Sequence, residues 1–102
     1  ARAIADVLAG AASEIAVSSI KSMIGHTLGA AGALSLIAVI LGMRDGFISP
    51  VLNLDAPDPH CGALDFVVGQ ARAKKTPVAL VNAFGSGAGN MSVVVGAYKA
   101  PK

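Results

Sequence analysis

Lys21 and His26 are the residues of this chain whose type and position first suggest chemistry. Both lie just before a long apolar segment, residues 27–43, that has no charged side chain. A cation and an imidazole are costly to bury beside such a segment, so a functional reason for the pair is expected. Five positions apart, they would be separated by about 140° on a helix and would not share a face. They converge only if Lys21 lies in a loop before the helix and His26 lies in its first turn.

That arrangement would make His26 a hydrogen-bond donor. The positive end of a helix disfavours an imidazolium, which leaves a neutral ring that donates from one nitrogen. Such a donor stabilises negative charge that develops on an oxygen. The spacing alone also allows a histidine that caps or packs against the helix, beside a surface lysine.

The second candidate is the glycine-rich stretch Phe-Gly-Ser-Gly-Ala-Gly-Asn at residues 84–90. It contains too much glycine for a packed element, and its open backbone amides can bind an anion or an oxyanion. A phosphate-binding loop is the alternative. However, the stretch has no Gly-Lys-Ser/Thr, and a strand-like rather than a helix-like pattern follows it.

The other titratable residues predict no further site. Cys61 lies in a Pro/Gly loop with no basic residue beyond His60, so we expect an inert thiol and a surface histidine. Together with His26 they lack the spacing of metal ligands, and no metal site is predicted. Three aspartates are expected at turns and on the surface: Asp55, Asp58 and Asp65.

Hydrophobic patterning predicts an α/β chain around these residues. A short helix is predicted for residues 2–8 with Gly10 as its terminator, and a buried strand for 15–20. The long helix is predicted from about His26 or Thr27 to about Leu41, ended by Gly42 or Gly46. After the long helix, the sequence predicts an extended segment at 47–54, a loop at 56–62 and a strand at 64–68. An exposed polar stretch is predicted at 70–76. Two strands are predicted at 77–81 and 91–98, joined by the glycines of 85–89.

Composition indicates that this chain buries part of its surface against something else. A chain of 102 residues forms at most one domain with a modest core. Yet 54% of its residues are apolar and 14% are charged, against a usual quarter. The net charge of +2 comes with no basic stripe, so nucleic-acid binding has little support. The single cysteine excludes an internal disulfide and fits a reducing compartment, so with no signal-peptide pattern we expect a cytoplasmic protein. No cofactor is predicted.

Residues 23–43 also have the length of a membrane span, about 20 residues. Gly25 and Gly29 form a Gly-x-x-x-Gly pair. Against a span, a lysine and a histidine lie at one end, and glycine and alanine contribute little transfer free energy. A buried helix of a soluble protein is favoured, and a small membrane protein is kept as an alternative.

Four motifs occur together in a known order. They are Lys-x-x-x-Gly-His-x-x-Gly-Ala-Ala-Gly at 21–32, Pro-x-Leu-Asn-Leu at 50–54, Pro-Asp-Pro at 57–59, and Val-Ala-Leu-Val-Asn-Ala-Phe-Gly-x-Gly at 78–87. In this order they resemble the β-ketoacyl synthases, the condensing enzymes of fatty-acid and polyketide synthesis. The resemblance covers essentially the whole chain but only the C-terminal part of a family member.

The resemblance implies the C-terminal part of a thiolase-like α/β fold, with a long buried helix packed on a mixed β-sheet. Residues 1–102 would be an incomplete segment, because the nucleophilic cysteine and first catalytic histidine of the family lie further upstream. The implied reaction is decarboxylative Claisen condensation of an acyl thioester with malonyl-carrier protein. The implied catalytic residues are His26 and Lys21, and the implied oxyanion and pocket loop comprises Phe84, Gly85, Ser86 and Gly87. The implied partners are acyl carrier protein, the rest of the synthase chain, and a second subunit in a homo- or heterodimer.

Two departures from the family pattern point to a specialised member. Ser86 stands where the family has a phenylalanine that gates the acyl pocket, so the backbone donor is kept and the bulky gate is lost. Ser35 stands where a glutamate commonly meets the lysine, which should leave Lys21 less tightly held. A polyketide-type condensing enzyme fits these changes, and so does a non-catalytic subunit similar to a chain-length factor.

Overall fold

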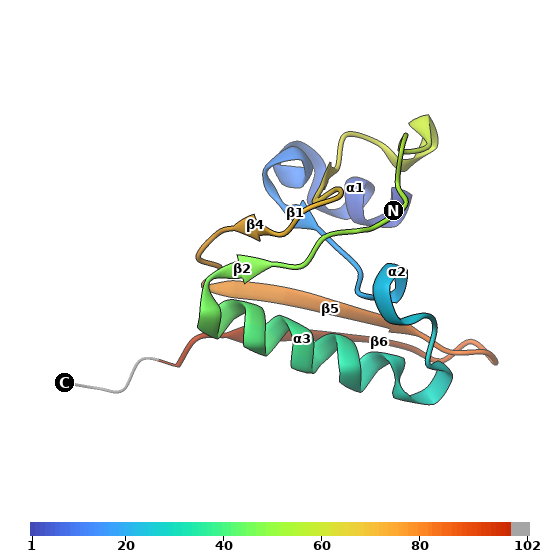
Figure 1. Cartoon of the computed structure of the whole chain (residues 1–102). Coiled ribbons are helices and arrows are strands. Elements are labelled where there is room, and N and C mark those ends of the chain that lie inside the picture. The colour runs from blue at the N-terminus through green and yellow to red at the C-terminus, as the bar shows by residue number, and fades with distance from the viewer. Residues whose placement is uncertain (99–102) are drawn as a thin grey trace.

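One long helix and one long hairpin lie together in the computed structural model, which describes residues 1–98, and the short helices and strands lie above them in the view of Figure 1. The helices are α1 (Arg2–Leu8), α2 (Lys21–Ile24) and α3 (Ala31–Asp45), with 3₁₀ turns η1 (Ala9–Glu14), η2 (Leu28–Ala30) and η3 (Pro59–Cys61). The strands are β1 (Ala16–Val17), β2 (Phe47–Ile48), β3 (Asp65–Phe66), β4 (Arg72–Ala73), β5 (Val78–Phe84) and β6 (Asn90–Gly96).

The strands pair two by two within the described chain. β1 pairs with β3 in parallel, whereas β2–β4 and β5–β6 are antiparallel. An isolated parallel bridge joins Val51 to Val68. The mixture of helices with parallel and antiparallel pairs confirms the predicted α/β class.

Helix α3 packs along β5 of the hairpin, as the prediction of a helix on a sheet requires (Figure 1). Val81, at the middle of β5, is buried. Gly32 of α3 comes so close to Ala83 that an added Cβ would lie 3.3 Å from the Ala83 Cβ. Small residues at the start of α3 therefore let the helix approach the sheet closely.

The end of α3 lies further along the chain than the predicted Leu41. The helix continues to Asp45, and Gly46 ends it in the left-handed conformation with φ 79°. Its N–H donates to the Gly42 carbonyl at 2.8 Å. Gly42 lies inside the helix, and the returning chain comes close to it: a Cβ there would lie 2.6 Å from the Phe47 carbonyl oxygen.

Other boundaries also differ from the predictions. The long helix starts with η2 at Leu28 and becomes α-helical at Ala31, not at His26 or Thr27. Gly10 does not end the helical region, because the chain turns at Ala9 with φ 43° and continues as η1. The stretch 70–76, predicted as exposed and polar, contains β4, whose pairing partner is distant in the sequence.

Large apolar faces remain uncovered in residues 1–98. The buried apolar residues are Ala12, Ala31, Val67 and Val81. Ile37 on α3 is 52% exposed and Phe84 on β5 is 73% exposed. The predicted burial of the long helix is thus not reached within this chain, where its buried residues are Ala31 and Gly42. Exposed apolar area of this extent marks surfaces that another part of a protein covers.

The stretch Leu28–Asp45 has the length and apolar composition of a membrane span, with 18 residues and a mean hydropathy of 1.5. Core helices of soluble proteins meet the same two criteria. Like the core helices of soluble proteins, α3 packs against a strand, here β5.

Candidate active site

The lysine of the candidate pair begins a helix of a single turn. Lys21 is the first residue of α2, not part of a loop as predicted. Gly25 closes this turn with φ 77°, and its N–H donates to the Lys21 carbonyl at 2.9 Å. Glycine suits this position because side-chain-bearing residues rarely adopt a positive φ. The break at Gly25 separates α2 from the long helix and places His26 between the two.

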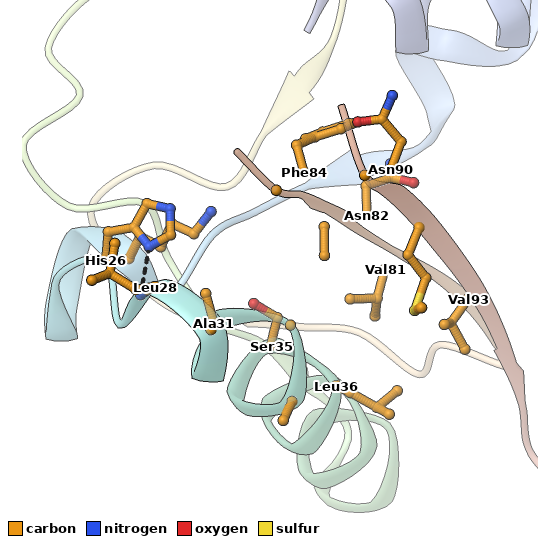
Figure 2. Close-up of a pocket in the computed structure, with 18 residues that line it drawn as sticks. His26, Leu28, Ala31, Ser35, Leu36, Val81, Asn82, Phe84, Asn90 and Val93 are labelled. Atoms are coloured by element: carbon orange, nitrogen blue, oxygen red, sulfur yellow. Dashed lines mark hydrogen bonds between the residues drawn. The ribbon is translucent and has the colours of Figure 1, made fainter. Parts of the chain in front are cut away.

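His26 accepts a hydrogen bond on one ring nitrogen. The backbone N–H of Leu28 donates to its Nδ1 at 2.9 Å (Figure 2). An accepting nitrogen carries no proton, so the neutral ring in this arrangement has its proton on Nε2. Leu28 has φ 50°, an uncommon conformation for a leucine, and strained backbone of this kind gathers at functional sites. The ring therefore has Nε2 as its donor, although it is exposed, not buried as the sequence suggested.

A pocket of about 520 Å³ lies between the start of α3 and the β5–β6 hairpin. Lys21 and His26 line it from the helical side, and Phe84 and Gly85 line it from the hairpin. Figure 2 shows His26 on the helical side and Phe84 across the pocket, at the far end of β5. Four of the predicted site residues, from segments far apart in the sequence, thus share one cavity.

Ser86 and Gly87, the other two predicted residues, are absent from the residues that line this pocket. They lie at the tip of the hairpin, where Gly87 has φ 91° and Ala88 has φ 66°. The Gly85 N–H donates to the Gly89 carbonyl at 2.7 Å and closes the loop. The amide of Gly85 is therefore engaged, and an anion at this loop would have to use amides beyond it.

Helix α3 contributes a serine to the pocket wall. Ser35 lines the pocket, at the position where the family commonly has a glutamate, and points toward the hairpin (Figure 2). Among residues 1–98 the ion pairs are Arg2–Asp6, Arg44–Asp45 and Arg72–Asp65. Lys21 belongs to none of these pairs, so its exposed ammonium group has no carboxylate partner in the described chain.

Sequence reasoning missed the asparagines of the hairpin. Asn82 and Asn90 both line the pocket. The side-chain oxygen Oδ1 of Asn82 accepts from the hydroxyl of Ser92 at 2.6 Å across the hairpin. The strand register places Asn82 opposite Ser92, so the two polar side chains meet across the hairpin.

Cys61 and His60 lie away from this pocket, in η3. Asp58 caps that turn by accepting from the His60 N–H at 2.8 Å. In the part of the chain that the structure describes, no three His, Cys, Asp or Glu side chains form a group suited to a metal ion.

Asp65 is not the solvated surface residue that the sequence suggested. It is half-buried on β3 and forms a two-pronged ion pair with Arg72 of β4, one contact of which is 2.9 Å. The hydrogen bond from Arg72 lowers the pKa of Asp65, and the positive charge of Arg72 acts in the same direction. This pair connects two short strands that have few contacts of their own.

Comparisons with known proteins show which family this chain belongs to. Residues 1–55 match the family model described as beta-ketoacyl synthase, C-terminal domain. A 3-oxoacyl-[acyl-carrier-protein] synthase 2 from Synechocystis sp. is 43% identical over 98 residues, which are 96% of this chain and 23% of the relative. The chain therefore spans about a quarter of that relative's length.

Two solved structures are similar in fold. One is a type II PKS acyl-carrier protein in complex with its ketosynthase bound to the hexaketide, with a TM-score of 0.89 and 33% identity over 95% of this chain and 24% of that chain. The other is the ishigamide ketosynthase/chain length factor, with a TM-score of 0.75 and 36% identity over 78% of this chain and 20% of that chain.

Proposed function

Because the chain belongs to the β-ketoacyl synthase C-terminal domain family, we propose that it supplies the C-terminal part of the active site of a β-ketoacyl-[acyl-carrier-protein] synthase. The synthase would join an acyl thioester to malonyl-carrier protein in fatty-acid or polyketide synthesis. The observation that carries this proposal is the geometry of His26. Its Nδ1 is occupied by the Leu28 N–H, and the residue lines a pocket together with Lys21, Phe84 and Gly85.

The chemistry assigned to His26 is stabilisation of an enolate. When the malonyl thioester loses CO₂, the electron pair of the broken carbon–carbon bond moves toward the thioester oxygen. The Nε2–H of His26 donates to that oxygen, and the lower charge there reduces the barrier. The enolate carbon then attacks the acyl thioester, forms the new carbon–carbon bond and expels a thiolate.

Lys21 has a supporting electrostatic role in this proposal. It lines the same pocket as His26, and its ammonium group has no carboxylate partner among residues 1–98. A positive charge near the developing enolate, and near the malonyl carboxylate before it leaves, favours binding and reaction. Ser35 in the pocket wall leaves this charge available.

The other reactants and partners follow from the same proposal. The nucleophilic cysteine that holds the acyl group, and a second histidine, would come from the remainder of the synthase chain. That remainder would also cover the exposed apolar residues of α3 and the hairpin, such as Ile37 and Phe84. Acyl carrier protein would deliver both thioesters; one similar ketosynthase was solved in complex with such a carrier.

We also propose a cytoplasmic homo- or heterodimer without a membrane span, a nucleic-acid partner, a metal or a cofactor. Contact of α3 with β5 supports a core helix in place of a membrane span. A membrane protein would stay with the lipid fraction after a high-salt wash, and the synthase would not.

A second candidate function is a non-catalytic partner subunit that sets chain length. Ser86 and Ser35, which replace a bulky gate and a carboxylate of the family pattern, favour it, and one similar structure is a ketosynthase/chain length factor. The residue at the upstream cysteine position separates the two candidates. A cysteine there supports the enzyme, and a glutamine or another non-nucleophile supports the subunit.

The test is an assay of the complete protein with acyl- and malonyl-carrier protein, following CO₂ release and the mass of the carrier-bound product. The enzyme proposal expects stoichiometric CO₂ and a β-ketoacyl product two carbons longer. The segment 1–102 alone is expected to be inactive, because its one cysteine, Cys61, is not the nucleophile that holds the acyl group. Absence of both CO₂ and product from the folded complete protein would contradict the enzyme proposal and favour the partner subunit.

A further inference from the structure

The helix that carries Lys21, α2, is too short to be stable on its own. Helix α2 has four residues, and isolated helices shorter than about 12 residues are marginal in water. Its N-cap residue Ile20 provides no side-chain cap, and the bond from the Lys21 N–H to the Ser19 hydroxyl oxygen at 3.3 Å is local. Its turn is closed by the bonds from the Ile24 N–H to Ile20 at 3.1 Å and from the Gly25 N–H to Lys21 at 2.9 Å. Contacts from outside the turn must therefore fix its orientation.

Ser22 makes such a contact. Its hydroxyl oxygen accepts from the backbone N–H of Leu52 at 2.9 Å, although the two residues are 30 positions apart. The same hydroxyl donates to the Ser19 carbonyl at 3.1 Å. One half-buried side chain thus joins the start of α2 to a segment that follows β2.

The segment held by Ser22 is itself anchored in the core. The Val51 N–H donates to the Val67 carbonyl at 2.7 Å, and the Val51 carbonyl accepts from the Gly69 N–H at 3.1 Å. Val67 is 1% exposed, the most buried large side chain described. In turn, the Val67 N–H donates to the Val17 carbonyl at 3.0 Å. Through Leu52 and its neighbour Val51, Ser22 therefore connects α2 to the buried Val67.

We propose that Ser22 is a positioning residue for the candidate active site. By bonding to Leu52, it holds α2 so that Lys21 and His26 stay at the rim of the pocket. Ser22 does not line that pocket, so it acts through its neighbours and not on the substrate. The catalytic consequence of Ser22 rests on the proposed function, whereas the Ser22–Leu52 hydrogen bond is independent of that function.

The complete synthase would carry out two steps that can be measured separately. Loading of the acyl group uses the upstream cysteine, whereas decarboxylation uses Lys21 and His26. In Ser22→Ala, CO₂ release from malonyl-carrier protein should fall on the order of tenfold, because small displacements of positioned groups slow reactions by such factors. Acyl loading, followed by intact mass, should stay within about twofold of wild type. A residue with only a stabilising role would change both steps in parallel.

Two further variants complete the design. Ser22→Thr keeps the hydroxyl and should recover most of the CO₂ release. Ser13→Ala is the matched control, because Ser13 is exposed and takes part in none of the side-chain hydrogen bonds found in residues 1–98. Thermal unfolding midpoints of all variants report whether the fold is kept.

A readout independent of activity is hydrogen exchange at the Leu52 amide. It should be protected in wild type and exchange at least tenfold faster in Ser22→Ala, with Ser22→Thr close to wild type. The proposal is overturned if Leu52 exchange is unchanged, if loading falls together with decarboxylation, or if Ser22→Thr behaves like Ser22→Ala. If wild type releases no CO₂ but Leu52 protection depends on Ser22, the proposed function fails and the tether stands.

Discussion

The backbone N–H of Leu28 donates to Nδ1 of His26 at 2.9 Å, and this bond determines which ring nitrogen carries the proton. The chain turns between the two residues so that a backbone N–H two positions after His26 meets its ring, and Leu28 then continues with a positive φ of 50°. The donor nitrogen left for a substrate is Nε2. Its chemistry in the proposed reaction is therefore decided by a backbone turn and not by another side chain.

Substitution of His26 should separate the donor function from the size of the side chain. In the complete synthase, His26→Ala is expected to reduce malonyl decarboxylation by about 10²- to 10³-fold, the usual effect of losing one donor to a developing oxyanion. His26→Gln places an amide N–H near the position of Nε2 and should retain more activity than His26→Asn. Radiolabelled CO₂ release measures all three variants. Equal rates for His26→Ala and wild type would remove His26 from the mechanism.

Restoring the bulk of the family gate should restrict the acyl group. Ser86 does not line the pocket but follows Gly85, which does, so the larger side chain of Ser86→Phe is expected to reach it and to lower loading of long acyl chains relative to short ones by about tenfold. Ser86→Ala is the control and should leave the ratio unchanged. Competition between long and short acyl-carrier proteins, read by mass spectrometry of the enzyme, measures the ratio. An unchanged ratio in Ser86→Phe would mean that this position does not gate the pocket.

The tight return after α3 should make Gly42 intolerant of a side chain. In Gly42→Ala the new Cβ would lie 2.6 Å from a backbone oxygen of Phe47. We expect a loss of about 1–3 kcal/mol in the free energy of unfolding, as for other overpacked sites. Gly10→Ala is the matched control, because no heavy atom outside its chain neighbours lies within 4 Å of a Cβ there. Chemical unfolding of both variants tests this, and equal stability would contradict the close contact.

The ion pair between Asp65 and Arg72 should make part of the stability depend on pH. Since the hydrogen bond from Arg72 lowers the pKa of Asp65 in the folded state, the pair stabilises the fold above the ordinary Asp pKa of about 3.9. This contribution is lost as the pH falls through the lowered folded value. Asp65→Asn should therefore unfold at a lower temperature than wild type at pH 7, and the difference should shrink below pH 4. A difference that is constant with pH would show that the charge pair does not contribute.

Several elements could be predicted from local sequence. The helix at residues 2–8 is found with the predicted bounds, because its apolar spacing is a local signal. The two late strands and their glycine loop are found as the β5–β6 hairpin, although β5 extends to Phe84 and β6 begins at Asn90. The sequence also predicted that Lys21 and His26 converge, and both line one pocket, although the structure places Lys21 in a helical turn.

Other features depend on tertiary contacts that local patterns do not predict. Gly42 appeared to be a helix terminator, yet it lies inside α3, where the returning chain at Phe47 leaves no room for a side chain. The strand β4 appeared to be exposed polar chain, yet it pairs with β2 and carries Arg72 to Asp65. Propensity is a weak guide in such places, since packing and long-range hydrogen bonds override it.

The sequence by itself determined the class of the chain, the family to which it belongs and the residues proposed for the reaction, because periodicity and motif spacing are properties of neighbouring positions. Only the tertiary structure decided which of those residues share a pocket, which nitrogen of His26 donates, and that Ser22 connects the lysine-bearing turn to Leu52. These are hydrogen bonds and contacts between segments up to tens of residues apart. They exist only after the backbone has folded and satisfied its polar groups.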